Sequence, residues 1–280
     1  MNKEIEMTFK KLEVGIQGVF ETENYKRYLR CMSKFWRYSV NNSMLILLQN
    51  PDSTYVTGAS KWATMNRKIC YGAKSIKILL PHPYVKEIEV TDEEGNKKMV
   101  ERSFVYFTLG NVFDISQTEV IDGKDDGFCT ICNEVNSNSI SQEFIDCVVK
   151  VANCPVQYWN LKDNSKGFYS LKEDKIVIKK EMSNDNTLKT LFHEIAHKRL
   201  HSGENTKTRQ VKEIEAESVS YVCMQHFGVE STEQYSFEYL ASWSKGKSIP
   251  ELKEILTDIQ KQAKEIIDEV EMMLNQEGVQ

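Results

Sequence analysis

Two histidines four residues apart frame an acidic residue in the segment His193-Glu-Ile-Ala-His197. On a helix, side chains at positions i and i+4 lie on the same face, so both imidazoles can bind one ion. Glu194 lies beside them and can reach a water in an open coordination position. This HExxH pattern is typical of hydrolases in which two histidines bind zinc and the glutamate acts as general base. We therefore predict Zn²⁺ as cofactor, His193 and His197 as ligands, and Glu194 as the catalytic residue.

A catalytic zinc site needs a third protein ligand. His201 continues the row of histidines, but it lies one turn further on and cannot complete a tetrahedron on a straight helix. One protease class has its third histidine six residues after His197, where this chain has Gly203, so that class is excluded. A later helical segment offers Glu213 and Glu217 on one face. We predict Glu213 as the third ligand and Glu217 as the acid that holds a metal-bound histidine, and an exchange of these two roles remains open.

Two other parts of a zinc peptidase have weaker signals in the sequence. An edge strand beside the metal can hold an extended peptide by main-chain hydrogen bonds, and we expect Lys175–Lys180 to be that strand. A donor must also stabilise the oxyanion. Tyr221 and His201 are both candidates, and the sequence does not choose between them.

The pattern of apolar residues predicts the elements around these side chains. Residues 1–48 have helical periodicity, residues 75–80 form a strand that Pro81 and Pro83 end, and a hairpin follows at 85–90 and 99–109. Further on we expect strands at 156–159, 167–170 and 175–179, and helices at 144–151, 184–200, 211–227 and 251–274. Residues 119–140 are rich in Gly, Asp, Asn and Ser. The predicted class is α+β, with a domain at 1–120, a linker at 121–140 and a second domain at 141–280.

Composition and cysteine usage indicate the class of protein. The 280 residues are 40% hydrophobic and 28% charged, which is globular usage. The longest apolar run, Met44–Leu48, is far shorter than a membrane span, and no signal peptide opens the sequence. Seven cysteines, an odd number in a long chain, argue against a disulfide framework. We therefore expect a cytoplasmic protein without a membrane anchor.

The net charge of −5 conceals a basic segment. Between Lys26 and Lys77 there are ten basic residues and one acid, Asp52, which gives this segment a charge of +9. Such separation of charge favours contact with a polyanion, although a solvated basic face explains it equally well. Aromatic residues are interleaved with the cations, as single-stranded nucleic acid requires.

Two blocks of sequence resemble the ArdC-like antirestriction proteins, including the LtrC-like members, which conjugative plasmids and other mobile elements carry. The first block includes Tyr38-Ser-Val-Asn-Asn-Ser-Met-Leu-Ile, Gln49-Asn-Pro, Gly72-Ala-Lys-Ser-Ile-Lys-Ile-Leu-Leu-Pro81 and Val112-Phe-Asp-Ile-Ser-Gln-Thr-Glu119. The second includes Leu191-Phe-His-Glu-Ile-Ala-His197 and Glu213-Ile-Glu-Ala-Glu-Ser-Val-Ser-Tyr221. The resemblance covers most of the chain.

The resemblance implies a mixed helix and antiparallel-strand domain that binds single-stranded DNA, followed by a gluzincin-like metallopeptidase domain that acts on an unknown protein substrate. For the DNA contacts we select Trp62, Arg67, Lys68 and Lys74, because that region is rich in loops and lies near Gly72. Two alternatives remain open. One is a non-catalytic DNA-coating protein with a structural metal site, and the other is a metal-assisted nuclease. A site with an open fourth position disfavours the first, and an HExxH motif in place of an Asp-rich site disfavours the second.

Overall fold

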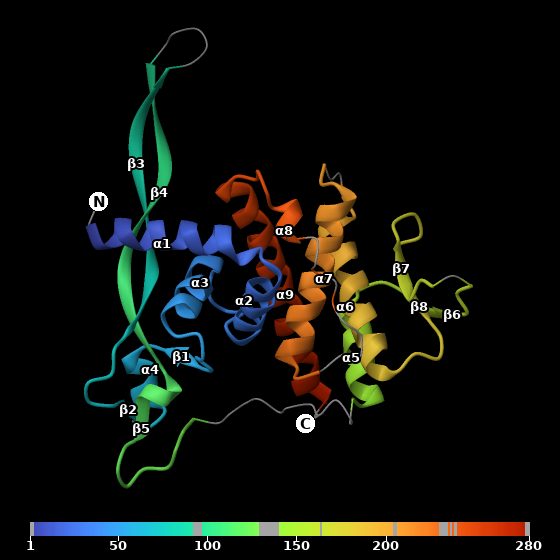
Figure 1. The fold of residues 1–280 in the computed structure, drawn as a ribbon, viewed down its shortest axis with the longest axis horizontal. Helices are drawn as coiled ribbons and strands as arrows, with labels where there is room; N and C mark the ends of the chain where they lie inside the picture. The colour runs from blue at the N-terminus through green and yellow to red at the C-terminus, as the bar shows by residue number, and fades with distance from the viewer. Residues whose placement is uncertain are drawn as a thin grey trace. The chain divides into compact units, whose positions relative to one another are not determined.

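The computed structural model of the chain describes residues 3–91, 97–128, 140–162, 164–203, 206–229, 235, 237 and 240–277 (Figure 1). The chain divides into two compact units. The first, which we call the hairpin unit, contains residues 1–14 and 45–128, and the second, which we call the metal unit, contains residues 15–44 and 129–280. The boundaries of these units differ from those of the predicted domains, because residues 15–44 cluster with the C-terminal half of the chain. The predicted domain boundaries stay a prediction, and part of the predicted linker, 129–139, lies outside the described residues.

A long two-stranded hairpin dominates the hairpin unit (Figure 1). Strand β3 (Ile76–Thr91) pairs with β4 (Lys97–Asp114) in antiparallel register, from Ile76 opposite Val112 to Thr91 opposite Lys97. The prediction that Pro81 and Pro83 end the first strand is therefore wrong. Among the described strands, β3 pairs with β4 alone over this stretch. An edge strand tolerates proline where the missing N–H would point away from the paired side.

Short elements close the base of the hairpin unit. They are β1 (Val56–Thr57), α4 (Ala59–Thr64), β2 (Arg67–Ile69), the 3₁₀ turn η1 (Ile115–Gln117) and β5 (Thr118–Val120). β1 pairs with the end of β4, and β2 pairs antiparallel with β5. The buried Asp114 carboxylate accepts hydrogen bonds from the backbone N–H groups of Thr54, Tyr55 and Ser116, and so joins the segment before β1 to the 3₁₀ turn after β4.

Helices α1 (Lys3–Val19) and α3 (Val40–Gln49) each contribute residues to both units. Between them lies α2 (Thr22–Lys34). The single helical stretch predicted over residues 1–48 is therefore three helices, interrupted at Phe20 and again after Lys34. The predicted apolar face is nevertheless buried, with Tyr25, Tyr28 and Leu29 fully enclosed.

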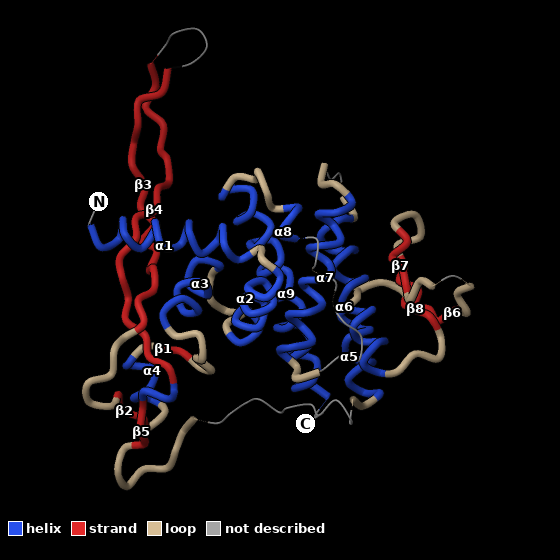
Figure 2. Tube along the Cα trace, in the orientation of Figure 1, coloured by secondary structure: helices blue, strands red, loops and turns tan. Residues whose placement is uncertain are grey.

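The metal unit is mainly helical (Figure 2). Its described helices after α2 are α5 (Gln142–Val151), α6 (Asn184–His201), α7 (Arg209–His226), α8 (Leu240–Trp243) and α9 (Ile249–Glu277). Helix α7 packs against α2, α6 and α9, while α5 packs against α6 and α9. Leu191, Ile195, Val219, Ile259 and Ile266 are fully buried, so apolar faces that recur at helical spacing form this core.

A small mixed sheet precedes α6. It has the order β6 (Val156–Trp159), β8 (Lys175–Lys179), β7 (Gly167–Ser170), with β6 parallel and β7 antiparallel to the central β8. Helices and antiparallel strands are thus combined in one chain, which confirms the predicted α+β class. Among the residues that the structure describes, no helix has both the length and the apolar composition of a membrane span.

Candidate metal centre

Helices α6 and α7 lie side by side in the metal unit and place the acidic and histidine side chains opposite one another (Figure 1). Contacts join Lys189 to Ser220, His193 to Glu217 and His197 to Glu213, so the two helices run antiparallel. The start of α7 is fixed by Thr208, whose hydroxyl accepts a hydrogen bond from the Val211 N–H. Because the apolar faces of both helices are buried, the register between the two rows of polar side chains is fixed.

The structure brings His193, His197 and Glu213 together in one cluster. The two Nε2 atoms of the histidines are 2.9 Å apart, and the Glu213 Oε2 atom lies 3.6 Å from His193 Nε2 and 3.7 Å from His197 Nε2. A point equidistant from three atoms with these separations lies about 2.0 Å from each, which is the bond length that zinc makes to nitrogen and oxygen. Two imidazoles and one carboxylate are also a donor set of catalytic zinc sites. The residues present therefore fit a single divalent ion.

Glu217 lies on the far side of His193 from this cluster. Its Oε2 atom is 3.2 Å from His193 Nδ1, and its Oε1 atom is 3.5 Å from Lys189 Nζ. Burial alone would lower the pKa of His193, but the hydrogen bonds to Glu213 and Glu217 outweigh it and raise that pKa to about 9. Hydrogen bonds from His193 and His197 hold the pKa of the Glu213 carboxyl well below its usual range. Both glutamates thus present carboxylates to the histidines.

His197 has a hydrogen-bonded partner that sequence reasoning missed. His197 Nδ1 is 3.0 Å from His201 Nδ1, and His201 Nε2 is 2.9 Å from Oε2 of Glu215, a fully buried carboxylate. Lys207 Nζ lies 2.6 Å from the other oxygen of Glu215 and 2.6 Å from Asp258. If His197 binds an ion through Nε2, its Nδ1–H donates to His201, and His201 then donates from Nε2 to Glu215. The i+4 spacing of His201 was a visible signal, but its link to Glu215 depends on the register of the two helices.

Glu194 is buried next to the cluster, with 7% of its surface exposed. Burial raises the pKa of its carboxyl, and this effect exceeds the opposing attraction of His193 and His197. The carboxylate also accepts a hydrogen bond from the Tyr169 backbone N–H, on β7. A carboxyl group whose pKa is raised toward neutrality suits proton transfer in both directions.

Both β7 and β8 contact α6, but β8 is the central strand, so the prediction that Lys175–Lys180 forms the edge strand is wrong. β8 contains Lys175–Lys179 and pairs on both sides, whereas β7 pairs only with β8 among the described strands. Gly167 allows β7 to approach α6 closely. A Cβ atom at this position would lie 2.7 Å from Thr190 Cγ2 and 2.8 Å from the Val177 carbonyl oxygen.

Neither oxyanion candidate presents a donor to the cluster. The Tyr221 hydroxyl accepts a hydrogen bond from Arg30 Nε at 3.0 Å, and Tyr221 lies two helical turns beyond Glu213. Both ring nitrogens of His201 are occupied, by His197 and Glu215. Neither residue is therefore placed to donate a hydrogen bond directly to the reacting carbonyl.

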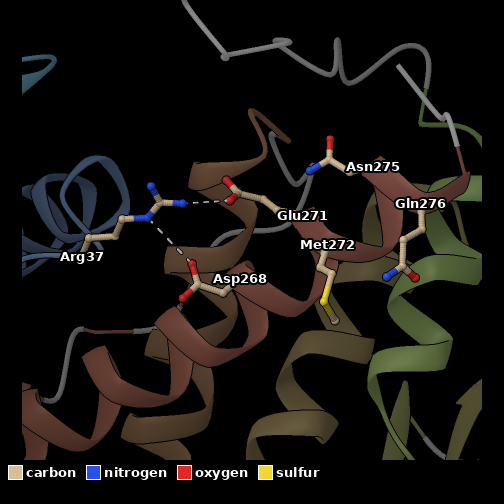
Figure 3. Close-up of a pocket in the computed structure, with 6 residues that line it drawn as sticks. All are labelled: Arg37, Asp268, Glu271, Met272, Asn275 and Gln276. Atoms are coloured by element: carbon tan, nitrogen blue, oxygen red, sulfur yellow. Dashed lines mark hydrogen bonds and ion pairs between the residues drawn. The ribbon is translucent and has the colours of Figure 1, made fainter. Parts of the chain in front are cut away.

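A surface pocket elsewhere in the metal unit is lined by Arg37, Asp268, Glu271, Met272, Asn275 and Gln276 (Figure 3). The Arg37 guanidinium lies 3.4 Å from the Glu271 carboxylate and 3.9 Å from Asp268. Glu271 also contacts His226, and Asp268 contacts Lys264. Because the charged groups of the pocket are already paired and it shares no residue with the metal cluster, we do not assign it to the site.

The four residues selected for DNA binding do not form one exposed surface. Trp62 is fully buried and donates from Nε1 to the Phe113 carbonyl oxygen, so it cannot stack on a base, and its selection is corrected. Arg67 and Lys68 lie on β2 and not in a loop, and they contact Asp126 and Glu119 respectively. Lys74 is exposed.

The basic segment 26–77 is also not a single surface. Its first half, through Met44, belongs to the metal unit and its second half to the hairpin unit. Within the first half, Arg30 is engaged by Tyr221 and Arg37 by Glu271. The charge of +9 therefore does not locate a nucleic-acid surface.

Comparison with known proteins places these units in context. Residues 3–113 match the family model of the N-terminal domain of the anti-restriction factor ArdC. The metal-free crystal structure of the antirestriction ArdC protein from plasmid R388 shares the fold, with a TM-score of 0.52, 16% identity and 85% of each chain covered. The Mn(II)-bound structure of that protein gives a TM-score of 0.51 at 16% identity, with 84% of this chain and 83% of that chain covered.

A longer relative is the uncharacterized protein pXO2-81 of Bacillus anthracis. It is 23% identical over 283 residues, which cover 88% of this chain. The match covers 47% of the relative, so this chain spans about half the length of the curated relative that it matches.

Proposed function

The chain is an ArdC-like protein, and we propose that it is an antirestriction-type protein of mobile elements that binds single-stranded DNA and has a zinc-dependent peptidase site. The observation that carries the peptidase proposal is the cluster of His193, His197 and Glu213 with the buried Glu194 beside it. The DNA-binding proposal rests on the matched N-terminal domain.

Three residues would hold the ion. His193 and His197 would bind through Nε2, because these atoms face each other and the Glu213 carboxylate. Glu217 would accept from His193 Nδ1–H, and His201 would accept from His197 Nδ1–H, so each ring is fixed in the tautomer that leaves Nε2 free for the metal. When bound, zinc supplies a Lewis acid that polarises a carbonyl group and lowers the pKa of water.

Glu194 would then transfer the proton. Its carboxylate accepts a proton from the attacking water and returns it to the nitrogen of the leaving amine. The burial that raises the pKa of Glu194 favours this exchange, because a strongly acidic carboxyl would not hold the proton between the two steps. The hydrogen bond from the Tyr169 N–H keeps the carboxylate oriented toward the cluster.

β7 would position the substrate. Its free edge lies on the strand that contacts Glu194, and an extended peptide can add to such an edge through main-chain hydrogen bonds. Gly167 supports this arrangement, since its missing side chain lets β7 lie against α6. An amide in an extended peptide is therefore the proposed substrate class.

Two alternatives are less well supported. A structural zinc site normally has four protein ligands, mostly Cys and His, whereas the described residues offer three here. A nuclease that uses Mg²⁺ prefers several carboxylates, whereas two of the three donors here are imidazoles.

The proposal is tested by hydrolysis of an unfolded protein by the full-length, zinc-loaded chain, with and without single-stranded DNA. Glu194→Gln should keep the metal and abolish cleavage, while Glu254→Gln, a change at an exposed position of α9, should leave cleavage unchanged. Cleavage by Glu194→Gln at the rate of the parent protein would refute the assigned mechanism.

A further inference from the structure

The β3–β4 hairpin has two chemically different faces. Side chains alternate between the faces along each strand, and residues directly opposite each other share a face. On one face, which we call the aromatic face, three successive pairs carry only aromatic and cationic side chains: His82 with Tyr106, Tyr84 with Phe104, and Lys86 with Arg102. The intervening pairs belong to the opposite face.

The rings of the aromatic face are ordered and open to solvent. The His82 and Tyr106 rings stack at 4.9 Å with an interplanar angle of 17°, and the Tyr84 and Phe104 rings stack at 5.6 Å with an angle of 26°. Tyr84 is 45% exposed, Phe104 is 36% exposed and Tyr106 is 54% exposed. Large aromatic side chains usually bury most of their surface, so an exposed group of them indicates a binding surface.

Charge separates the two faces further. From Leu80 and Thr108 to Val90 and Lys98, the aromatic face has no carboxylate. The acids of this stretch, which are Glu87, Glu89 and Glu101, all lie on the opposite face. Neither Lys86 nor Arg102 forms an ion pair with any residue that the structure describes, whereas Lys97 on the opposite face contacts Glu89 at 2.7 Å. The cations of the aromatic face are therefore available to a polyanion.

The opposite face is partly covered within the same unit. The Phe107 ring packs edge to face against Phe9 of α1 at a centroid distance of 5.7 Å. Phe107 is opposite Pro81, one position removed from the aromatic pairs. The opposite face thus packs against α1 at Phe107, whereas the rings of the aromatic face stay open to solvent.

We propose that the aromatic face of the hairpin is the surface that holds single-stranded DNA. This inference rests on the proposed DNA-binding function and locates it. Single strands bind where unpaired bases stack on aromatic rings beside cations that contact the phosphates. Successive pairs on one face are roughly 6.8 Å apart along the strand, so two ring pairs followed by a cationic pair form a short linear track. A duplex hides its base faces, so this surface should prefer unpaired strands.

The test uses the full-length chain and a fluorescent 20-nucleotide oligo(dT), with affinity measured by anisotropy at several salt concentrations. Tyr84→Ala combined with Phe104→Ala should weaken binding by about 5- to 150-fold for each stacked base that is lost. Val85→Ala combined with Val105→Ala is the matched control, because both valines are exposed on the opposite face. This control should bind as the parent protein does.

A second variant keeps the proposal testable if the ring variant fails to fold. Lys86→Gln combined with Arg102→Gln changes exposed side chains and leaves the rings in place, so its melting temperature should match that of the parent. For this variant, the slope of log K against the logarithm of the salt concentration should be smaller in magnitude by about 1.4. Each phosphate neutralised on a single strand contributes about 0.7 to that slope. Tyr84→Phe should bind as the parent does, because stacking needs the ring and not the hydroxyl.

The outcomes separate the two proposals. A parent protein that does not bind oligo(dT) would refute DNA binding and this inference together. Parent binding that is unchanged in both the ring and the cation variants would leave DNA binding in place and refute the aromatic face as its site. Equal competition by duplex DNA would also refute it, because a duplex offers no base faces for stacking.

Discussion

The two acids of α7 provide a sharp test of the metal site, because they share a helical face and differ in what they touch. Glu213 Oε2 lies within 3.7 Å of both histidine Nε2 atoms, whereas Glu217 Oε2 lies 3.2 Å from Nδ1 on the far side of His193. Glu213→Gln should therefore remove a ligand, and Glu217→Gln should remove the charge that orients a ligand. Both substitutions preserve the size of the side chain.

The expected magnitudes differ. Four-ligand zinc sites bind with apparent free energies of about 10–16 kcal/mol, so one ligand is worth about 2.5–4 kcal/mol, or roughly 70- to 900-fold in affinity. Partners of bound histidines contribute about 10- to 100-fold. Glu217→Gln retains an oxygen that can accept a hydrogen bond from Nδ1–H of His193. Its zinc affinity should therefore fall by about 10-fold, the lower end of that range. We expect zinc affinity to fall in the order parent, Glu217→Gln, Glu213→Gln.

The assay is competition for zinc between the full-length protein and a fluorescent chelator at constant pH. Glu254→Gln controls for the loss of a carboxylate elsewhere. Thermal unfolding of the metal-free proteins controls for damage to the fold. In this control Glu213→Gln should lower the melting temperature less than Glu217→Gln does, because 44% of the Glu213 side chain is exposed compared with 19% for Glu217. Added zinc should then raise the melting temperature of the parent most, since the stabilisation of the folded state grows with the logarithm of the free zinc concentration divided by Kd.

A weaker zinc affinity in Glu217→Gln than in Glu213→Gln would show that the two roles are exchanged. Parent-like affinity in Glu213→Gln would refute Glu213 as a ligand.

Three further changes test other parts of the structure. His201→Phe should weaken zinc binding by about 10- to 100-fold in the chelator assay, because His197 loses the acceptor that fixes its tautomer, and an unchanged affinity would refute that role. Gly167→Ala should lower the free energy of unfolding by about 1–3 kcal/mol in chemical denaturation, because its Cβ would overlap Thr190. An unchanged free energy of unfolding would show that β7 does not pack closely on α6. Trp62→Ala should cost about 3–5 kcal/mol of stability because Trp62 is fully buried, and a stable variant with weak DNA binding would instead restore Trp62 as a DNA contact.

The part of the site that could be predicted from the sequence lies within single helices. The i+4 rule places His193 and His197 on one face of α6, and it places Glu213 and Glu217 on one face of α7. The structure then brings these faces together. The metal-site pattern also predicts that a glutamate of the later helix joins the two histidines, with Glu213 as the ligand. The link from His197 through His201 to Glu215 depends on the register between the helices and could not be predicted.

The order of the strands within the sheets is a second feature that could not be predicted from the sequence. The strands at 156–159, 167–170 and 175–179 have the predicted ranges, but the sequence does not encode which of them is central, so the edge was assigned to β8 in place of β7. Pro81 and Pro83 were interpreted as strand ends because the pattern alone does not show that β3 has an unpaired edge. Strand alternation would have revealed the aromatic face, but only once β3 and β4 were known to pair through both prolines.

Net charge along the sequence was a poor guide to the surface that we propose for DNA. Counting cations between Lys26 and Lys77 combined residues from two units and ignored their partners, such as Tyr221 for Arg30 and Asp126 for Arg67. The cations of the aromatic face, Lys86 and Arg102, lie outside that segment and beside acids in the sequence. Their separation from those acids arises only when the strands form.

The measurement that tests the central claim most directly is the zinc content of purified, metal-reconstituted full-length protein and its variants. The site predicts about one zinc per chain in the parent and in Glu194→Gln, because the role proposed for Glu194 is to transfer a proton and not to bind the ion. It predicts loss of that zinc in His193→Ala. Full zinc occupancy in His193→Ala would contradict the assignment of the metal centre.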